Sequence, residues 1–269
     1  MHISGRTREI LRTLAVFLAA CLVLCLIRLF FFSLYTVSSP RPTAEFQAGD
    51  RLLVSRTSYG VRLPFPEYTN YRRLGSGMPE RGDWMAFNMP YDSLNEISNR
   101  TVCIAQCLAL PGDTVWLTKD MKVSRRQSKD SYPFVVPAKG RRVSITKWNA
   151  RLVCNTINLH EPCHCAELKG DTLLIDGHTT NYVVFTQDYF WVFSGMQSNT
   201  DDSRSYGLVP QNHIIGKVML ILYSVKPGEP VYRRIRADRF FKTPQNSLKR
   251  NNRCFCRQPI CRLCSGSPS

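Results

Sequence analysis

The stretch from Val102 to Asp113 reads Val-Cys-Ile-Ala-Gln-Cys-Leu-Ala-Leu-Pro-Gly-Asp. Its first eight residues are mostly apolar or small, which is typical of a strand whose two faces are both covered. Cys103 and Cys107 are four residues apart, so they would share one face of that strand. Pro111-Gly112-Asp113 then predicts a turn. We therefore expect a buried core strand here, ended by a tight turn.

Short apolar or alternating runs of the same kind occur before and after this stretch, each flanked by Gly, Pro, Asp or Asn. They are residues 51–55, 84–88, 101–108, 114–117, 182–185, 189–193 and 214–225. Leu173–Gly177 ends in Asp-Gly, a strong hairpin signal. One helix is expected over residues 148–157, capped by Thr146. Many short strands and few helices predict a mainly β fold, an antiparallel barrel or sandwich.

The N-terminus carries a basic segment and then a long apolar one. Residues 1–13 contain three arginines, and residues 14–37 have Arg28 as their single charged residue. A membrane-spanning helix needs about 20 mostly apolar residues, and no small-x-small site follows where a signal peptide would be cut. We expect a retained transmembrane anchor over residues 14–37 in the cell inner membrane. Residues 1–13 would be cytoplasmic and the bulk of the chain periplasmic.

The charge of the chain limits its partners. The 269 residues carry a net charge of +16, which favours an anionic partner such as nucleic acid or a membrane surface. The sequence contains no zinc-finger, helix-turn-helix or ribonucleoprotein signature, so we expect a membrane partner and no nucleic acid. Ten basic residues follow residue 232, against one acid, Asp238. We expect residues 227–269 to form a mobile basic tail, either a solvated end or a contact for anionic lipid.

The eleven cysteines suggest disulfides more than metal binding. Cys163-His164-Cys165 and the four cysteines between residues 254 and 264 lack the paired C-x2-C spacing of structural zinc sites. We therefore expect no metal ion and no other cofactor. Disulfide bonds are expected if this part of the chain lies in an oxidising compartment.

Several short segments occur in an order and spacing that resemble the type I signal peptidases, or bacterial leader peptidases. These segments are Tyr35–Thr43 leading to Gly49-Asp50, Tyr59-Gly60 with Arg62-Leu63-Pro64, Leu110–Asp113, Asp202-Ser203-Arg204 and Gly216-Lys217. The family consists of membrane-anchored serine endopeptidases that remove secretory signal peptides. The resemblance implies a signal-peptidase β domain over residues 38–226. It also implies an insert at about 118–172, like the one in Bacteroidetes-type members.

The same resemblance implies that the catalytic positions of the family are altered. The family uses a Ser–Lys dyad, with the lysine eight residues before the aspartate of the turn, and that position is Ala105. Alignment on Pro42-Thr43 makes Ser39 the nucleophile, whereas an alignment without gaps places Arg41 there. Alanine cannot accept a proton, and arginine stays protonated. Asp202 and Arg204, which support the site in the family, are retained.

These departures leave three hypotheses about function. The first is a membrane-bound homologue that has lost catalysis but still recognises an extended signal-peptide-like segment or a partner peptidase by strand addition. The second is an active signal peptidase in which Ser39 uses a different base, and the candidates include Lys119, Lys122, Lys147 and Lys217. The third is a structural membrane protein that acts through its basic tail. We favour the first hypothesis, because the departures fall where the chemistry of the family is concentrated.

Overall fold

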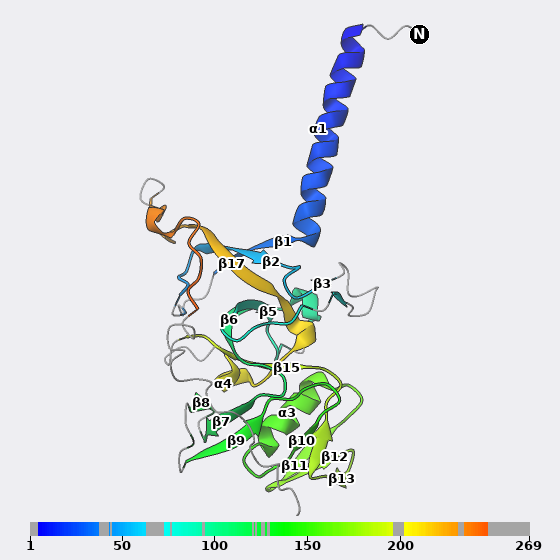
Figure 1. Ribbon diagram of the computed structural model, residues 1–269, viewed down its shortest axis with the longest axis vertical. Coiled ribbons are helices and arrows are strands. Elements are labelled where there is room, and N and C mark those ends of the chain that lie inside the picture. Colours follow the sequence, from blue (N-terminus) through cyan, green and yellow to red (C-terminus); the bar gives the residue numbers. More distant parts are fainter. Residues whose placement is uncertain are drawn as a thin grey trace, which may run out of the picture.

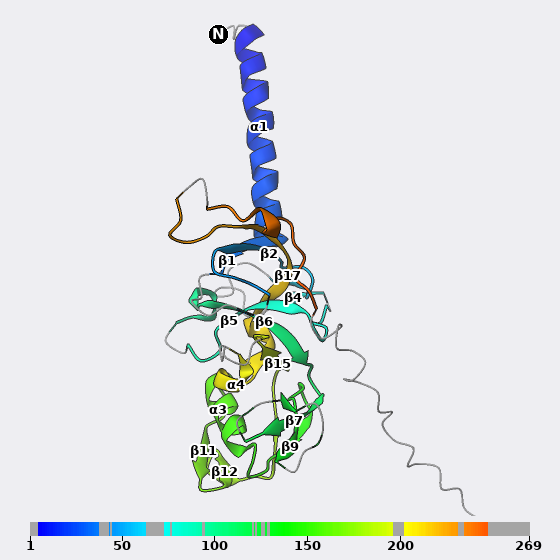
Figure 2. The same cartoon turned by 90° about the vertical axis from the view of Figure 1, so that its left-hand side faces the viewer.

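The protein consists of a long N-terminal helix that stands on one end of a mainly β domain (Figures 1 and 2). The computed structural model describes residues 5–37, 43, 45–62, 73–75, 77–92, 95–119, 121, 123–124, 127, 130–195, 202–230 and 234–246. The helices are α1 (Gly5–Phe30), α3 (Ala150–His160) and α4 (Ser203–Tyr206), with 3-10 turns η1 (Ile97–Asn99), η2 (Gln211–His213) and η4 (Ala237–Arg239).

The predicted helix over residues 14–37 is wrong at its C-terminal end. Helix α1 stops at Phe30, and residues 32–36 form strand β1, which pairs with residues 51–55. The aromatic and β-branched residues of this segment suit an extended strand, and a neighbouring strand is there to pair with it. Among the described helices, none combines the length and the apolar character that crossing a membrane requires.

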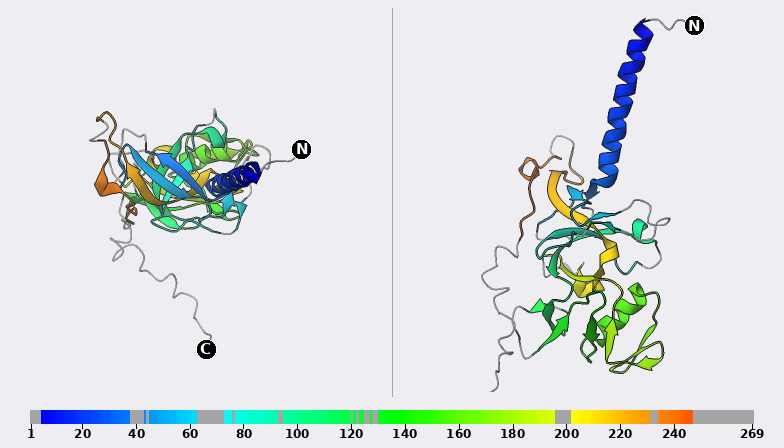
Figure 3. Two further views of the ribbon diagram at one scale, coloured as in Figure 1. Left: turned by 90° about the horizontal axis from the view of Figure 1, so that it is seen from above. Right: turned by 45° about the vertical axis from the view of Figure 1, so that its right-hand side comes forward.

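A seven-stranded antiparallel sheet forms the centre of the domain and curls into a half-barrel (Figures 1 and 3). Its strands, in spatial order, are β1 (Phe32–Thr36), β2 (Asp50–Ser55), β17 (Ile214–Ser224), β5 (Trp84–Asn88), β6 (Val102–Ala109), β15 (Tyr189–Phe193) and β16 (Val209–Pro210). The register between β17 and its two neighbours shifts at several points, and such irregularities strengthen the twist of a sheet. At Gly216 a Cβ atom would lie 2.1 Å from the Ser55 carbonyl oxygen, so only glycine allows β17 and β2 to approach this closely.

The two faces of this sheet bury different sets of side chains. One face packs around Phe46, Leu52, Trp84 and Ile221. The other face packs around a group that includes Ala105; this group is described with the candidate site. The strand that we expected at 101–108 is therefore confirmed as a central strand covered on both faces, since β6 lies between β5 and β15.

The chain between β6 and β15 forms an insert with its own hydrophobic core. Its small sheets contain β7 (Thr114–Thr118), β8 (Val123–Ser124), β9 (Ser131–Val135), β10 (Arg142–Ser144), β11 (Ala166–Lys169), β12 (Thr172–Ile175), β13 (His178–Thr179) and β14 (Tyr182–Val184). A further pair, β3 (Val61–Arg62) and β4 (Arg73–Leu74), lies outside the insert. The Asp176-Gly177 hairpin is confirmed, because both residues have positive φ between β12 and β13.

Helix α3 is the helix expected after Thr146. Leu152, Val153 and Ile157 are buried in the core of the insert, as the apolar spacing predicted. The cap differs from the prediction, because Asn149 is the N-cap residue. Its amide oxygen accepts a hydrogen bond from Thr146 N at 2.8 Å.

The predicted mobile tail is wrong for its first part. Residues 234–246, which we call the strap, run back along the domain from the end where α1 leaves it (Figures 1 and 3). Arg239 donates two hydrogen bonds to the fully buried carboxylate of Asp50, at 2.6 and 3.0 Å. Further along, the Gln245 carbonyl accepts a hydrogen bond from the Trp84 indole at 3.0 Å. The strap therefore completes the face around Trp84, and residues 247–269 lie outside the described residues.

Candidate functional site

The site indicated by the sequence centres on Ala105, in the middle of β6. Its side chain is fully buried and belongs to a cluster formed by strands β5, β6, β15, β16 and β17 together with Tyr59. The cluster also contains Tyr59, Met85, Phe87, Cys107, Phe190, Val192, Val209 and Ile214. We call this side of the sheet the Ala105 face; its members are buried, and it reaches the edge of the sheet at β16, which contributes Val209. A residue at this position meets an apolar environment, which disfavours a charged side chain.

A short hydrogen-bonded chain of polar groups borders the Ala105 face. The Tyr59 hydroxyl donates to Asp83 Oδ2 at 2.9 Å, and Lys217 Nζ lies 2.8 Å from Asp83 Oδ1. Burial, and then the Asp83 carboxylate, raise the pKa of Tyr59 well above its ordinary value, so its phenol stays protonated. Lys217 forms an ion pair in this arrangement, and a neutral amine there would forfeit that pair.

A second polar cluster is built around the buried carboxylate of Asp202, at the N-terminus of α4. Asp202 Oδ2 accepts hydrogen bonds from the backbone N and the hydroxyl of Ser194, both at 2.9 Å. Arg204 binds both carboxylate oxygens, through Nε at 2.9 Å and Nη2 at 2.8 Å. The guanidinium also lies 4.8 Å from the ring of Phe193. The structure therefore brings together Asp202 and Arg204, as expected, and fixes the end of β15 next to α4.

Comparisons with known proteins identify the family of this chain. Residues 10–223 match the family model described as "Signal peptidase, peptidase S26". The chain belongs to the signal peptidase family. Signal peptidase I of Buchnera aphidicola (subsp. Baizongia pistaciae) is similar to this chain, with 22% identity over 80% of this chain and 77% of the relative. Signal peptidase I of Haemophilus influenzae is 26% identical over 81% and 71% of the two chains, and that of Pseudomonas fluorescens is 30% identical over 69% and 62%.

Of the residues expected at the dyad positions of this signal peptidase homologue, only Ala105 lies in the part of the chain that the structure describes. Ala105, which the resemblance aligns with the family lysine, is fully buried in the Ala105 face. Ser39 and Arg41, the two alternative nucleophile positions, lie outside the described residues. Gln106, where the family usually has arginine, is buried and donates to the Gly82 carbonyl at 2.9 Å and to Asn246 at 3.2 Å.

The lysines that might replace the missing base lie in different places. Lys119 and Lys147 are on the insert, where their ammonium groups lie 5.7 and 4.8 Å from the centre of the Trp148 ring. Lys217 is next to the Ala105 face but is paired with Asp83. Lys122 lies outside the described residues. Among the described candidates, Lys217 alone borders the site, and it does so as a charged partner.

Cys107, the buried cysteine of this face, is not suited to act as a replacement nucleophile. Burial is the main cause that raises the pKa of the Cys107 thiol, and the carboxylates of Asp83 and Asp113 add to it. The thiol therefore stays protonated, which makes it a poor nucleophile. The seven cysteines of the described part are free, so the disulfides that we expected are not formed there.

Two features of the signal peptidase site escaped the sequence analysis. The hydrogen-bonded chain from Tyr59 through Asp83 to Lys217 joins residues from three separate segments of the sequence. The contact of the strap with Gln106 was also missed, because strap residues have no apolar periodicity that would indicate packing. Both features join residues that are far apart in the sequence: the first depends on the packing of β5 next to β17, and the second on the return of the strap to the sheet.

Proposed function

We propose that this member of the signal peptidase family binds an extended secretory polypeptide at the Ala105 face without cleaving it. The observation that supports this most directly is the environment of Ala105. The position that holds the base in the family is occupied by a methyl group, and its neighbours are apolar side chains or protonated groups such as Cys107. A serine hydroxyl needs an adjacent base to attack a peptide carbonyl near neutral pH.

Retention of binding is supported by the parts of the family fold that are kept. The sheet ends in β1 and β16, and strand edges recognise extended peptides through main-chain hydrogen bonds that need no catalytic group. The Asp202–Arg204 ion pair is also kept, and it holds α4 against β15. An extended segment of a partner peptidase would bind in the same way, through main-chain hydrogen bonds.

We further propose that α1 attaches the domain to the inner membrane, with the bulk of the chain on the periplasmic side. Its apolar side chains are exposed around the helix, among them Phe17, Leu22 and Leu24, each more than 60% exposed. Phe31, Phe32 and Leu34 extend this apolar surface into β1. Such a continuous apolar surface is costly in water and favourable in lipid.

The first experiment measures binding and cleavage of the same substrate. The purified full chain is incubated with a secretory precursor that carries a photo-activatable cross-linker next to its cleavage site. We expect cross-linking without detectable cleavage, and no effect of Ser39→Ala on either. Cleavage that Ser39→Ala abolishes would instead establish an active peptidase with a different base, and the absence of any cross-link would refute the binding function.

A second experiment rebuilds the dyad at the spacing of the family. Ala105→Lys with Arg41→Ser restores a base and a nucleophile together, and burial at position 105 would lower the pKa of the new amine. We expect partial cleavage by the double variant and none by either single variant. Ala105→Met with Arg41→Ser is the matched control, because methionine has a similar length but no amine. Equal activity of this control would show that the added lysine is not acting as a base.

A further inference from the structure

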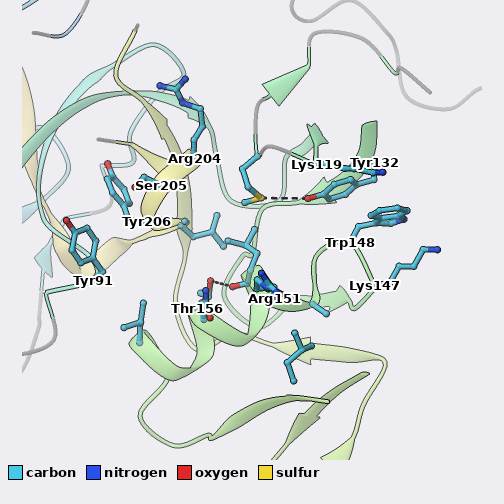
Figure 4. Close-up of a pocket in the computed structure, with 18 of the residues that line it drawn as sticks. Tyr91, Lys119, Tyr132, Lys147, Trp148, Arg151, Thr156, Arg204, Ser205 and Tyr206 are labelled. Atoms are coloured by element: carbon cyan, nitrogen blue, oxygen red, sulfur yellow. Dashed lines mark hydrogen bonds between the residues drawn. The ribbon is translucent and has the colours of Figure 1, made fainter. Parts of the chain in front are cut away.

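A groove of about 720 Å³ lies on the insert, between α3 and α4. The proposed function does not involve this groove. This volume falls within the range of ordinary ligand sites. We call it the insert groove. Figure 4 shows Trp148 and Tyr132 on one side of Arg151, and Tyr91 and Tyr206 on the opposite side.

The charges that line the insert groove are mainly positive. Lys119, Lys147 and Arg151 line it, and Asp171 is the single acidic residue among its described lining residues. Arg204 lines it as well, but its guanidinium is already bound to Asp202 and adds no free charge. Three cations against one acid favour an anionic occupant.

Aromatic and aliphatic side chains give the groove its second character. Trp148 is 46% exposed although it is large and apolar, and the ring of Tyr132 stacks on it at 6.0 Å between centroids. Leu159, also exposed, lines the groove from the last turn of α3, whereas Trp148 precedes that helix. A lining that combines cations with apolar surface is complementary to a polypeptide that carries both acidic and apolar side chains.

The groove adjoins the Ala105 face through Tyr206. Tyr206 lines the groove, and it also packs against the cluster around Ala105, with its ring 6.1 Å from that of Phe87. Tyr91 continues this aromatic contact at 6.3 Å from Tyr206. A polypeptide that lies on the Ala105 face can therefore continue into the groove past Tyr206.

We infer that the insert groove binds an acidic, extended segment of the polypeptide whose neighbouring part lies on the Ala105 face. The identity of this occupant rests on the proposed function, whereas binding of an acidic peptide to the groove does not. The cations of the groove would pair with its carboxylates, and Trp148 would cover one of its apolar side chains. The insert would thus select polypeptides by a segment outside the region that the sheet recognises.

The test uses Trp148 as a built-in reporter in the full chain. A peptide of alternating Asp and Leu is titrated against the protein in mild detergent at low salt, together with the same peptide in which Lys replaces Asp. We expect a change in tryptophan emission with the acidic peptide only, lost in Trp148→Phe. Raising the salt concentration should weaken binding, because exposed charges are screened over about 8 Å at physiological ionic strength.

Charge reversal distinguishes the groove from the rest of the basic surface. Affinity, measured by anisotropy of a labelled acidic peptide, should fall at least tenfold in Lys147→Glu with Arg151→Glu. It should change less than twofold in Arg141→Glu with Arg142→Glu, an exposed pair on the same insert that causes the same change in net charge.

Three results would overturn the inference: equal binding of the acidic and basic peptides, equal loss in both pairs of variants, or tighter binding of a single-stranded oligonucleotide of matched charge. Precursor cross-linking at the Ala105 face is measured in a separate experiment, with the unmodified protein and with the groove variants. A failure of that cross-linking in the unmodified protein would refute the proposed function and leave the groove intact.

Discussion

The carboxylate of Asp202 is fully buried and accepts hydrogen bonds from Ser194 and Arg204. Asp202→Ala would leave the guanidinium of Arg204, whose side chain is 8% exposed, without its carboxylate. Breaking a buried ion pair by removing one partner typically costs about 3–5 kcal/mol. We expect a loss of that size in the free energy of unfolding, measured by urea denaturation. Asp171→Ala, on the surface, is the control, and a loss below about 1 kcal/mol in Asp202→Ala would contradict the role assigned to this cluster.

His160 makes the domain sensitive to acid. Burial, and then the nearby charge of Arg100, lower its pKa to about 4. Between about pH 6.5 and pH 4 the unfolded chain takes up a proton that the folded chain resists, so stability falls as the pH falls through this window and then levels off. The loss amounts to about 3 kcal/mol at most. His160→Gln should remove this part of the pH dependence when unfolding is compared at pH 7 and pH 4.5. His178→Gln, on exposed β13, should not.

The strap contributes Arg239 to a buried charge pair with Asp50, in addition to its hydrogen bonds with Trp84 and Gln106. Arg239→Met keeps an apolar stem but leaves the carboxylate of Asp50 with Arg236 at 3.8 Å and the Gln47 amide at 2.9 Å. We expect a loss of about 3–5 kcal/mol in the free energy of unfolding, and faster proteolysis after residue 242. Adding Asp50→Asn should recover part of this loss. Arg234→Met, at an exposed strap position, should have little effect, and equal losses in both variants would argue against a specific pair.

The elements differ in how far their sequences predicted them. The central strands were predictable, because each is a short apolar run between turn residues, as in β5 and β6. Strand β1 was mistaken for helix because a run of Leu and Phe is compatible with both, and its pairing with β2 decides the outcome. The strap was missed because charges and carbonyl contacts hold it. At the site, motif spacing singled out Ala105, Asp202 and Arg204, and their roles stay predictions. The partners of Asp83, Tyr59 and Lys217, come from distant segments that spacing does not connect.

The two parts of the molecule should be separable. Most of the described side chains of α1 are exposed, and α1 contacts the β domain mainly through β1. We expect a chain lacking residues 1–30 to lose the helical part of its far-ultraviolet circular dichroism but to keep the β signal and a Tm within a few degrees of that of the full chain, while losing attachment to membranes. Removal of residues 1–36 also deletes β1 and should lower the Tm clearly. Unfolding of both truncated chains would show that α1 stabilises the β domain.

The pairing of Asp50 with Arg239 has a consequence for the order in which the chain can fold during synthesis. The two residues are 189 positions apart, and β2 also waits for β17, its neighbour in the sheet. At the usual rate of translation, roughly 10–40 s pass between their appearance. During that time the Asp50 carboxylate must remain hydrated, so the sheet cannot close around it. A chain released after β17 but before Arg239 would contain every strand of the sheet and still leave the carboxylate of Asp50 without its partner from the strap.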